Sequence, residues 1–337
     1  MQTALITGIS GEVGHGLIKK LAAQKYKVVA ADIRNPEEEI AGFIDNFYVC
    51  DVSDKTSVEK IFKRHDFDIV FHLASILSTG GEKNPELAAK VNIEGTLNLL
   101  EATTNKGLKN KKSIKFIFPS SIAAYGIDSL EVKSKNKKVS EEQFLNPISI
   151  YGISKLACEH LGNYFSKNYK LLGEIDRDSL IDFRCIRFPG LLSPDTVPSG
   201  GTSDYGPEMV HAAAQGKYYE CFVRAESTIP FMAMADAVEV LTNLASAPRK
   251  NLKSFVYNVR GFSATASEIY KMTKKFFPSF KMTYKINPER QRIVDTWPEE
   301  VNDSKAQKDW GWKPKYSFEK TFTEYLIPKI KTRYQSK

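Results

Sequence analysis

The segment TGISGEVG at positions 7–14 constrains the fold of this chain more than any other segment. It follows the apolar run Ala4–Ile6 and precedes a helical pattern, so its glycines stand where a strand turns into a helix. Gly8 allows a tight turn, Gly11 lets the backbone approach a pyrophosphate, and Gly14 lets the helix pack on the strand. The N–H groups that open the helix then face the phosphates. The segment predicts a dinucleotide-binding turn.

A second apolar run, at positions 27–31, ends in Asp32. A glycine triplet alone also fits an ordinary strand-to-helix turn. An acid in this place, however, is what presents a carboxylate to the ribose hydroxyls of adenosine. Strand, glycine turn, helix, strand and acid together indicate a complete βαβ unit.

Strand-like and helical runs alternate through the first half of the chain. The expected strands cover 68–73, 115–119 and 182–188, and the expected helices cover 87–103 and 151–169. This order predicts an α/β fold with a Rossmann-type, doubly wound parallel sheet. Ligands of such sheets bind at the carboxyl ends of the strands, which is where Asp51, Val52 and the segment 72–75 lie.

The regular alternation fails after Pro189, where the stretch Ser193–Gly206 is rich in Gly, Ser, Thr and Pro. We expect a substrate-binding lobe to begin there. A helical pattern at 233–245 and a strand-like run at 255–259 are expected to return to the sheet before the chain goes back to the second lobe.

The length and composition of the chain allow such a division. With 337 residues, 42% of them apolar, it can bury one large core or two modest ones. We expect residues 1–190 to form an NAD-binding domain, which residues 231–262 rejoin. Residues 191–230 and 263–330 are expected to form a smaller, mixed α/β substrate-binding lobe.

Membrane, secretory and metal-binding classes find no support in the sequence. No segment approaches the roughly 20 uncharged apolar residues that span a bilayer. Met1 runs almost straight into the first strand, which leaves no room for a signal or transit peptide, so we expect a cytoplasmic protein. The cysteines and histidines show no metal-ligand spacing, and we expect no metal; they are Cys50, Cys158, Cys185, Cys221, His15, His65, His72, His160 and His211.

The net charge of +8 invites a nucleic-acid interpretation, which we reject. Much of the excess lies in two lysine-rich stretches, Lys106–Lys115 and Lys133–Lys138. Neither stretch carries an aromatic residue on which a base could stack. We expect both to be solvated surface loops that favour solubility, and we expect no nucleic-acid partner.

Ser121, Tyr151 and Lys155 are the candidate catalytic residues. Tyr151 and Lys155 lie four apart on an expected helix and therefore on one face. The same spacing recurs at Tyr270, Tyr316 and Tyr325, but only Tyr151 follows a strand that ends in Pro-Ser-Ser within a chain that has a dinucleotide turn. The ammonium and an oxidised nicotinamide would lower the phenol pKa, and Ser121 would hold the substrate oxygen. The alternative is a buried tyrosine anchored by its hydroxyl beside a lysine that extends to solvent.

The motifs TGxxGxxG, HLA, PSS, YGxSK and RFPG, in this order, resemble the extended short-chain dehydrogenase/reductase superfamily over nearly the whole chain. More narrowly, the segment Gly200–Tyr205 and the segments 187–193, 219–222 and 309–312 resemble its NAD-dependent L-threonine 3-dehydrogenases. The resemblance implies Tyr151 as proton acceptor. It also implies three substrate contacts in addition to Ser121 and Tyr151, with the last on an amino group: Ser78, Thr202 and Asp204.

The expected cofactor is NAD, and the residues expected to hold it come from seven segments of the chain: Gly8, Ser10, Gly11, Glu12, Val13, Gly14, Asp32, Ile33, Arg34, Asp51, Val52, Leu73, Ala74, Ser75, Asn92, Tyr151, Lys155 and Leu191. Arg34 leaves one question open, because its guanidinium could pair with the 2′-phosphate of NADP.

Some positions depart from the pattern of these dehydrogenases. Tyr125 stands where they tend to have Phe, and Phe231 and Ala233 change a methionine-rich run that we expect near the pocket. Extra residues occur at Leu172–Leu180 and near Ser134–Lys138, both at expected surface loops. The changes affect the expected substrate specificity more than the reaction type.

Three functions remain open at this point. The first is oxidation of L-threonine to 2-amino-3-oxobutanoate. The second is epimerisation or dehydration of a sugar nucleotide, and the third is dinucleotide sensing without catalysis. The intact Ser121, Tyr151 and Lys155 favour an enzyme. By analogy with relatives, which pair through two helices per subunit, we expect a homodimer and no membrane partner.

Overall fold

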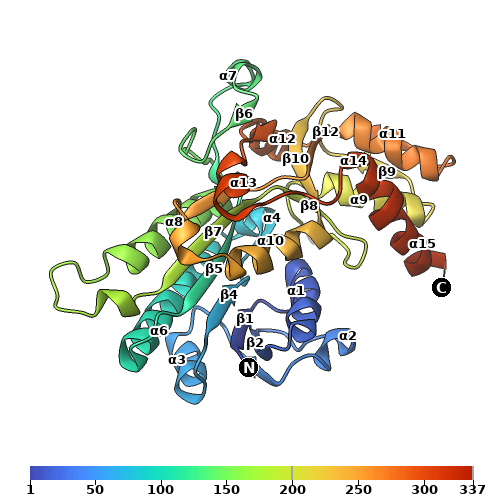
Figure 1. The fold of residues 1–337 in the computed structure, drawn as a ribbon. Coiled ribbons are helices and arrows are strands. Elements are labelled where there is room, and N and C mark those ends of the chain that lie inside the picture. The colour runs from blue at the N-terminus through green and yellow to red at the C-terminus, as the bar shows by residue number, and fades with distance from the viewer. Residues whose placement is uncertain (199, 336–337) are drawn as a thin grey trace.

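A parallel sheet of seven strands forms the centre of the computed structural model, which describes residues 1–198 and 200–335 (Figure 1). Every neighbouring pair in this sheet is parallel. The doubly wound α/β fold expected from the sequence is therefore confirmed. From one edge to the other, its strands are β11 (Val256–Asn258), β7 (Asp182–Phe188), β5 (Lys115–Ser121), β4 (Ile69–His72), β1 (Thr3–Thr7), β2 (Lys27–Asp32) and β3 (Asn46–Val49).

Helices cover both faces of the sheet. Successive residues of each strand point to opposite sides, so both faces carry apolar side chains that must be buried. Leu5 and Val70 pack under α3 (Lys55–Arg64), α6 (Gly95–Asn110) and α8 (Ile150–Lys167). Ile6 and Phe71 belong to the core that includes α1 (Glu12–Ala23) and α10 (Met234–Ser246) on the other face. Burying one such side chain stabilises the fold by about 1.5–3 kcal/mol, which explains the continuously apolar strands.

A second lobe is built around a three-stranded sheet (Figure 1). Its strands are β12 (Phe262–Thr265), β10 (Thr228–Ala233) and β8 (Gly190–Leu192). Two pairs of short parallel strands accompany it: β9 (Tyr219–Cys221) with β13 (Met282–Tyr284), and β6 (Lys138–Val139) with β14 (Glu300–Val301). The remaining α-helices are α2 (Glu38–Ala41), α4 (Ser78–Lys83), α5 (Pro85–Ala89), α7 (Leu130–Lys135), α9 (Tyr205–Ala214), α11 (Ala266–Phe276), α12 (Pro288–Asp295), α13 (Ser304–Trp310), α14 (Phe318–Lys320) and α15 (Ile327–Gln335).

The helix expected at 87–103 is interrupted. The chain forms α5, then a π-helical turn at Lys90–Glu94, and then α6. Asn92 lies in this turn and is buried. π-turns often occur at functional sites, and this one aims Asn92 at the loop that follows β4, as described below.

The expectation that both lysine-rich stretches are surface loops is wrong. Lys106–Asn110 belongs to α6, and Lys133, on α7, is buried with its ammonium donating to the carbonyl of Val294 at 3.2 Å. Burial lowers the pKa of Lys133 to about 8. Composition misleads here because a long lysine stem can pack against apolar neighbours.

Phe231 and Ala233, which we expected near the pocket, are both fully buried in the core. Phe231 makes an edge contact with Tyr205 at 5.7 Å between ring centroids. Its ring also lies so close to Gly190 that a Cβ there would come within 2.8 Å of it. These positions support the wall of the second lobe rather than face a ligand.

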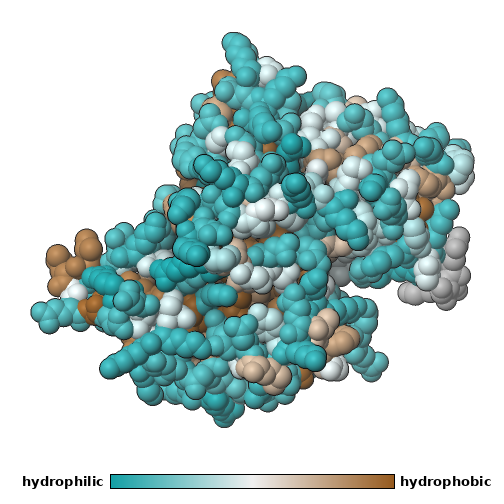
Figure 2. All heavy atoms as spheres, viewed as in Figure 1, coloured by the Kyte–Doolittle hydropathy of each residue, from teal (hydrophilic) through white to brown (hydrophobic). Residues whose placement is uncertain are grey.

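The face drawn in Figure 2 is mainly hydrophilic, with apolar side chains at one projecting tip and in smaller patches elsewhere. The segment between α8 and β7 carries the exposed Leu171 and Leu172, at the insertion expected from the sequence (Figure 1). Within the described residues, no helix has the length and apolar character required to cross a membrane.

Candidate functional site

A cavity of about 390 Å³ opens at the carboxyl ends of β1, β4, β5 and β7, between the central sheet and the second lobe. Its lining combines expected cofactor residues, all three expected catalytic residues and all expected substrate residues. The lining residues are Gly8, Gly11, Glu12, Val13, Gly14, Arg34, Leu73, Ser75, Leu77, Ser78, Gly80, Pro119, Ser120, Ser121, Tyr151, Lys155, Phe188, Pro189, Leu191, Gly201, Thr202, Ser203, Asp204 and Trp297.

The dinucleotide turn is shaped by two close backbone approaches. Gly8 has a φ of +74°, and a Cβ on it would lie 2.5 Å from the backbone nitrogen of Ala74. A Cβ on Gly14 would lie 2.3 Å from the carbonyl oxygen of Ile9. Only glycine fits either place. The resulting cradle leads into the N-terminus of α1, whose free N–H groups suit a pyrophosphate.

Asp32 is fixed at the end of β2 and is almost completely buried. Its two carboxylate oxygens accept hydrogen bonds from the backbone N–H groups of Ser10 at 2.9 Å and Arg34 at 3.0 Å. Because a carboxylate has about four acceptor positions, Asp32 can also accept from ribose hydroxyls. These residues fit the adenosine end of NAD. The largely exposed Arg34 guanidinium lies 4.0 Å from Asp32 and reaches the Ser10 carbonyl at 3.4 Å.

Asn92 shapes the loop after β4 from below. It accepts from the N–H of Ile76 at 2.8 Å and donates to the Ile76 carbonyl at 3.0 Å. It also donates to Ser154 at 3.1 Å and accepts from Ser75 at 3.2 Å. With its amide thus bonded, Asn92 positions Ser75 at the cavity and does not itself line it.

Ser121, Tyr151 and Lys155 converge in the cavity from β5 and α8. The Lys155 ammonium lies 5.5 Å from the centre of the Tyr151 ring and donates to the Pro119 carbonyl at 2.9 Å. The Ser121 hydroxyl hydrogen-bonds with Tyr151 and also accepts from the N–H of Ala123 at 3.1 Å. The structure therefore brings together the trio that the sequence identified.

Burial dominates the electrostatics of this trio. It raises the pKa of Tyr151 to about 12, although the hydrogen bond from Ser121 lowers it. Burial also lowers the pKa of Lys155 to about 8. We expected Lys155 and an oxidised nicotinamide together to lower the phenol pKa. The protein groups alone raise it, because the loss of hydration outweighs the hydrogen bond from Ser121.

Another wall of the cavity, where we expected substrate contacts, is built by the segment Gly200–Asp204 of the second lobe. Thr202 donates two hydrogen bonds to the Ser78 hydroxyl, from its N–H at 3.0 Å and from its own hydroxyl at 2.8 Å. The carbonyl of Gly200 accepts from the N–H of Thr79 at 3.3 Å. Since Ser78 accepts both bonds from Thr202, its own O–H remains available to donate to an anionic group.

Asp204 is held by its own loop. Its Oδ2 accepts from the N–H groups of Gly200 at 2.9 Å and Gly201 at 2.6 Å, and no described residue donates a hydrogen bond to its Oδ1. Arg290 supports the loop by donating to the Gly201 carbonyl at 2.7 Å. Burial raises the pKa of Asp204 despite these bonds. Oδ1 is therefore available to a cationic ligand group.

A buried ion pair lies beneath the trio. Arg187, on β7, donates to both oxygens of Glu159, on α8, at 2.8 and 2.6 Å, and both side chains are 1% exposed. Ser120 donates to the same carboxylate at 2.5 Å. The Arg187 guanidinium lies 4.7 Å from the centre of the Tyr125 ring, whose hydroxyl donates to Asn258 at 2.8 Å. The tyrosine at this position thus uses a hydroxyl that phenylalanine lacks.

Seven of the expected cofactor residues do not line the cavity: Ser10, Asp32, Ile33, Asp51, Val52, Ala74 and Asn92. Ser10, Asp32, Ala74 and Asn92 contact residues that do line it. The carboxylate of Asp51 accepts from Ser53, and Val52 packs against Gly95.

Several lining residues were not identified as site residues from the sequence. Pro119, Ser120, Phe188, Gly201 and Ser203 belong to motifs already recognised, so those motifs were a usable signal. Trp297 follows α12, far along the chain, and carries no local sequence signal. Ser199 lies outside the described residues.

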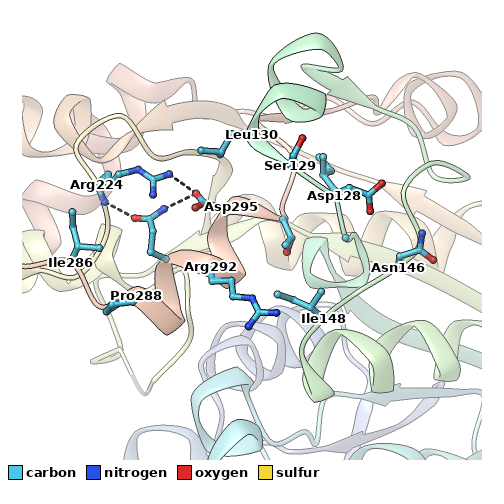
Figure 3. Close-up of a pocket in the computed structure, with 14 residues that line it drawn as sticks. Asp128, Ser129, Leu130, Asn146, Ile148, Arg224, Ile286, Pro288, Arg292 and Asp295 are labelled. Atoms are coloured by element: carbon cyan, nitrogen blue, oxygen red, sulfur yellow. Dashed lines mark hydrogen bonds and ion pairs between the residues drawn. The ribbon is translucent and has the colours of Figure 1, made fainter.

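A second cavity, of about 630 Å³, lies between the start of α7 and α12 (Figure 3). Arg224 donates there to Asp295 at 2.7 Å, and Gln291 bonds to the same carboxylate at 2.7 Å. The expected catalytic residues do not line it. In the part of the chain that the structure describes, no three His, Cys, Asp or Glu side chains gather as metal ligands, and the four cysteines are buried and free.

Comparisons with known proteins connect the whole chain to one group. Residues 4–259 match the NAD dependent epimerase/dehydratase family. The mitochondrial L-threonine 3-dehydrogenase of Bos taurus is 33% identical over 328 residues, which cover 96% of this chain and 82% of that protein. An uncharacterized epimerase/dehydratase of Staphylococcus haemolyticus is 32% identical over 341 residues and covers both chains completely. The solved apo structure of a monomeric L-threonine 3-dehydrogenase from a metagenome is 36% identical, with a TM-score of 0.84 over 98% of this chain and 99% of that one.

The buried pair beneath the trio predicts a stability effect. Replacing Glu159 by Gln leaves the Arg187 charge buried without a counter-ion, which typically costs about 3–5 kcal/mol. Urea denaturation of Glu159→Gln should show a loss of this size, and Glu131→Gln, at the exposed pair with Lys135, should show none. Equal stability of Glu159→Gln and the wild type would contradict the supporting role of the pair.

Proposed function

Because the chain belongs to the NAD-dependent epimerase/dehydratase family, we propose that it is an NAD-dependent dehydrogenase that oxidises L-threonine to 2-amino-3-oxobutanoate. The observation that carries this proposal is the convergence of Ser78, Thr202 and Asp204 on the cavity that holds Tyr151. The similarity to L-threonine 3-dehydrogenases over 96% of the chain or more supports the same choice.

The chain's own residues account for the proton chemistry. Ser121 donates a hydrogen bond to the hydroxyl oxygen of the substrate, and Tyr151 accepts the hydroxyl proton as the C–O bond becomes a carbonyl. Lys155 stabilises the phenolate. Its ammonium donates to the Pro119 carbonyl and lies 5.5 Å from the centre of the Tyr151 ring. NAD, when bound, would supply an acceptor for the hydride of C3 and a positive charge that favours the phenolate.

The polar groups opposite the trio match the rest of threonine. Asp204 Oδ1 accepts a hydrogen bond from the ammonium group, and the Ser78 O–H donates one to the carboxylate. Each contact pairs a buried protein group with a substrate group, which makes the loss of either costly. The cavity of about 390 Å³ suits an amino acid beside the nicotinamide.

The family match, which names epimerases and dehydratases, supports a second candidate: epimerisation or dehydration of a sugar nucleotide by the same trio. We also propose a cytoplasmic homodimer. Exposed apolar side chains on two neighbouring helices, Leu87 on α5 and Ile153 on α8, support an interface there.

Replacing Tyr151 by Phe removes the proton acceptor. Proton transfer by a positioned side chain contributes about 10²–10⁴-fold, so kcat for L-threonine should fall by at least that range while NAD still binds. Tyr270→Phe is the matched control, because Tyr270 has the same spacing to Lys274 and lies outside the cavity. Near-normal turnover of Tyr151→Phe would end the assignment.

Cofactor choice should follow Asp32. A carboxylate at the ribose accepts hydroxyl hydrogens and repels a 2′-phosphate, so kcat/KM should be higher with NAD than with NADP. Steady-state kinetics with both cofactors measure this. Equal or better kcat/KM with NADP would show that Arg34 governs the ribose end instead.

Substrate choice should depend on the paired polar contacts. NADH should form with L-threonine, much less with L-serine, and not with D-threonine or 3-hydroxybutyrate, because unpaired site groups can cost on the order of 10⁴ in kcat/KM. Thr202→Ala and Asp204→Ala should raise KM for threonine far more than KM for NAD. Should the protein ignore L-threonine and convert a UDP-, GDP- or dTDP-sugar, the second candidate replaces the first.

A further inference from the structure

Glu12 places a carboxyl group where NAD would bring another anion. It is the first residue of α1, directly after Gly11, and it lines the cavity together with Gly8 and Gly14. No described residue forms an ion pair or a hydrogen bond with its side chain. The turn that cradles a pyrophosphate thus carries an acid without a partner, although an anion and a carboxylate repel each other.

The charged neighbours of Glu12 do not compensate this acid. Across the cavity, Asp204 adds a second negative charge. Arg34 is occupied by Asp32 and the Ser10 carbonyl. On α8, Lys155 donates to the Pro119 carbonyl, and Tyr151 bonds with Ser121, so neither is paired with Glu12.

The elements packed on α1 bring their charges to other parts of the helix. The ion pairs of α1 with α10 and α2 are Lys20–Glu239 and Lys19–Glu39, in its C-terminal half. His15, one turn along the helix, is buried. Burial first, and Asp204 second, raise the pKa of the Glu12 carboxyl from 4.5 to about 7.

We propose that Glu12 is protonated in the NAD complex and donates its hydrogen to a pyrophosphate oxygen, so that binding of NAD takes up a proton from solvent. A protonated carboxyl has an O–H donor, whereas an ionised one has only acceptors. At this position the protonated carboxyl donates a hydrogen bond to the pyrophosphate, in addition to those from the backbone N–H groups of α1. The ionised carboxylate would instead repel the pyrophosphate. The inference rests on NAD as the cofactor.

The expected pH dependence follows from linkage. Below about pH 6 Glu12 is neutral with or without NAD, so its ionisation does not alter the affinity for NAD. Above pH 7 the free protein must gain a proton to bind. If the pyrophosphate raises the Glu12 pKa by a further 1–3 units, Kd should be about five- to tenfold higher at pH 8 than at pH 6.

Titration calorimetry of the whole protein with NAD tests the proposal. Runs at pH 8 in two buffers of different ionisation enthalpy count the protons taken up per NAD bound. Wild type should take up between about 0.4 and 0.9 proton at pH 8 and close to none at pH 5.5. Glu12→Gln, which keeps the shape and a donor, should lose this uptake and bind NAD more tightly than wild type at pH 8. The exposed Glu38→Gln is the control and should behave as wild type.

Each other outcome is decisive. Wild-type binding without proton uptake at pH 8 overturns the proposal, whatever the variant does, and so does unchanged uptake in Glu12→Gln. If Glu12→Gln leaves NAD binding unchanged and raises KM for threonine, Glu12 acts with Asp204 on the substrate ammonium and the proposal is wrong. Failure of the wild type to bind NAD would instead overturn the proposed cofactor.

Discussion

The bidentate ion pair between Arg187 and Glu159 is the interaction on which the site depends. It joins β7 to α8, and the bond from Ser120 ties the end of β5 to the same carboxylate. Burying two charges is costly, and the cost is offset only when the remaining hydrogen-bonding groups are satisfied. Arg187 meets this condition by also donating to the Glu141 carbonyl at 2.7 Å. Ser121 follows Ser120, and Lys155 precedes Glu159 by one helical turn, so the pair holds both catalytic candidates from beneath.

The second constraint is the contact between the two lobes. The segment Gly200–Asp204 is attached to α4 by the hydrogen bonds that Thr202 donates to Ser78. Arg290 also stabilises the segment by donating to the Gly201 carbonyl. The cavity therefore has one wall from the sheet and one wall from the lobe. In the function proposed above, the first wall carries the chemistry and the second wall recognises the substrate. One trio could then serve different substrates within a family, because only the second wall would need to change.

Local sequence determined the parts of this architecture that depend on backbone geometry. Gly8 and Gly14 were identified because no other residue tolerates those approaches, and Tyr151 because it follows a strand in a recognisable order. The trio was therefore visible in the sequence. Its electrostatics were not, since burial raises the pKa of Tyr151 and depends on the whole assembled cavity.

Other features arise only from tertiary packing. Trp297 joins the lining from a distant helix end, and Lys133 is buried although its neighbours in the sequence are lysines. The π-turn at Lys90–Glu94 has no distinctive amino-acid composition that would reveal it in the sequence. It places Asn92, which we expected to contact the cofactor, where its side chain supports the loop after β4. Sequence patterns report on residues that are close together along the chain, whereas these residues interact with residues that are distant in the sequence.

Transfer of isotope tests the central claim most directly. L-Threonine that carries deuterium at C3 should give NADH with one deuterium on the nicotinamide ring for each 2-amino-3-oxobutanoate formed, as measured by mass spectrometry. Wild-type protein should show this transfer, and Tyr151→Phe should show the same labelling at a much lower rate, because only the proton acceptor has been removed. Turnover of L-threonine that leaves the deuterium out of the recovered cofactor would contradict hydride transfer in this site.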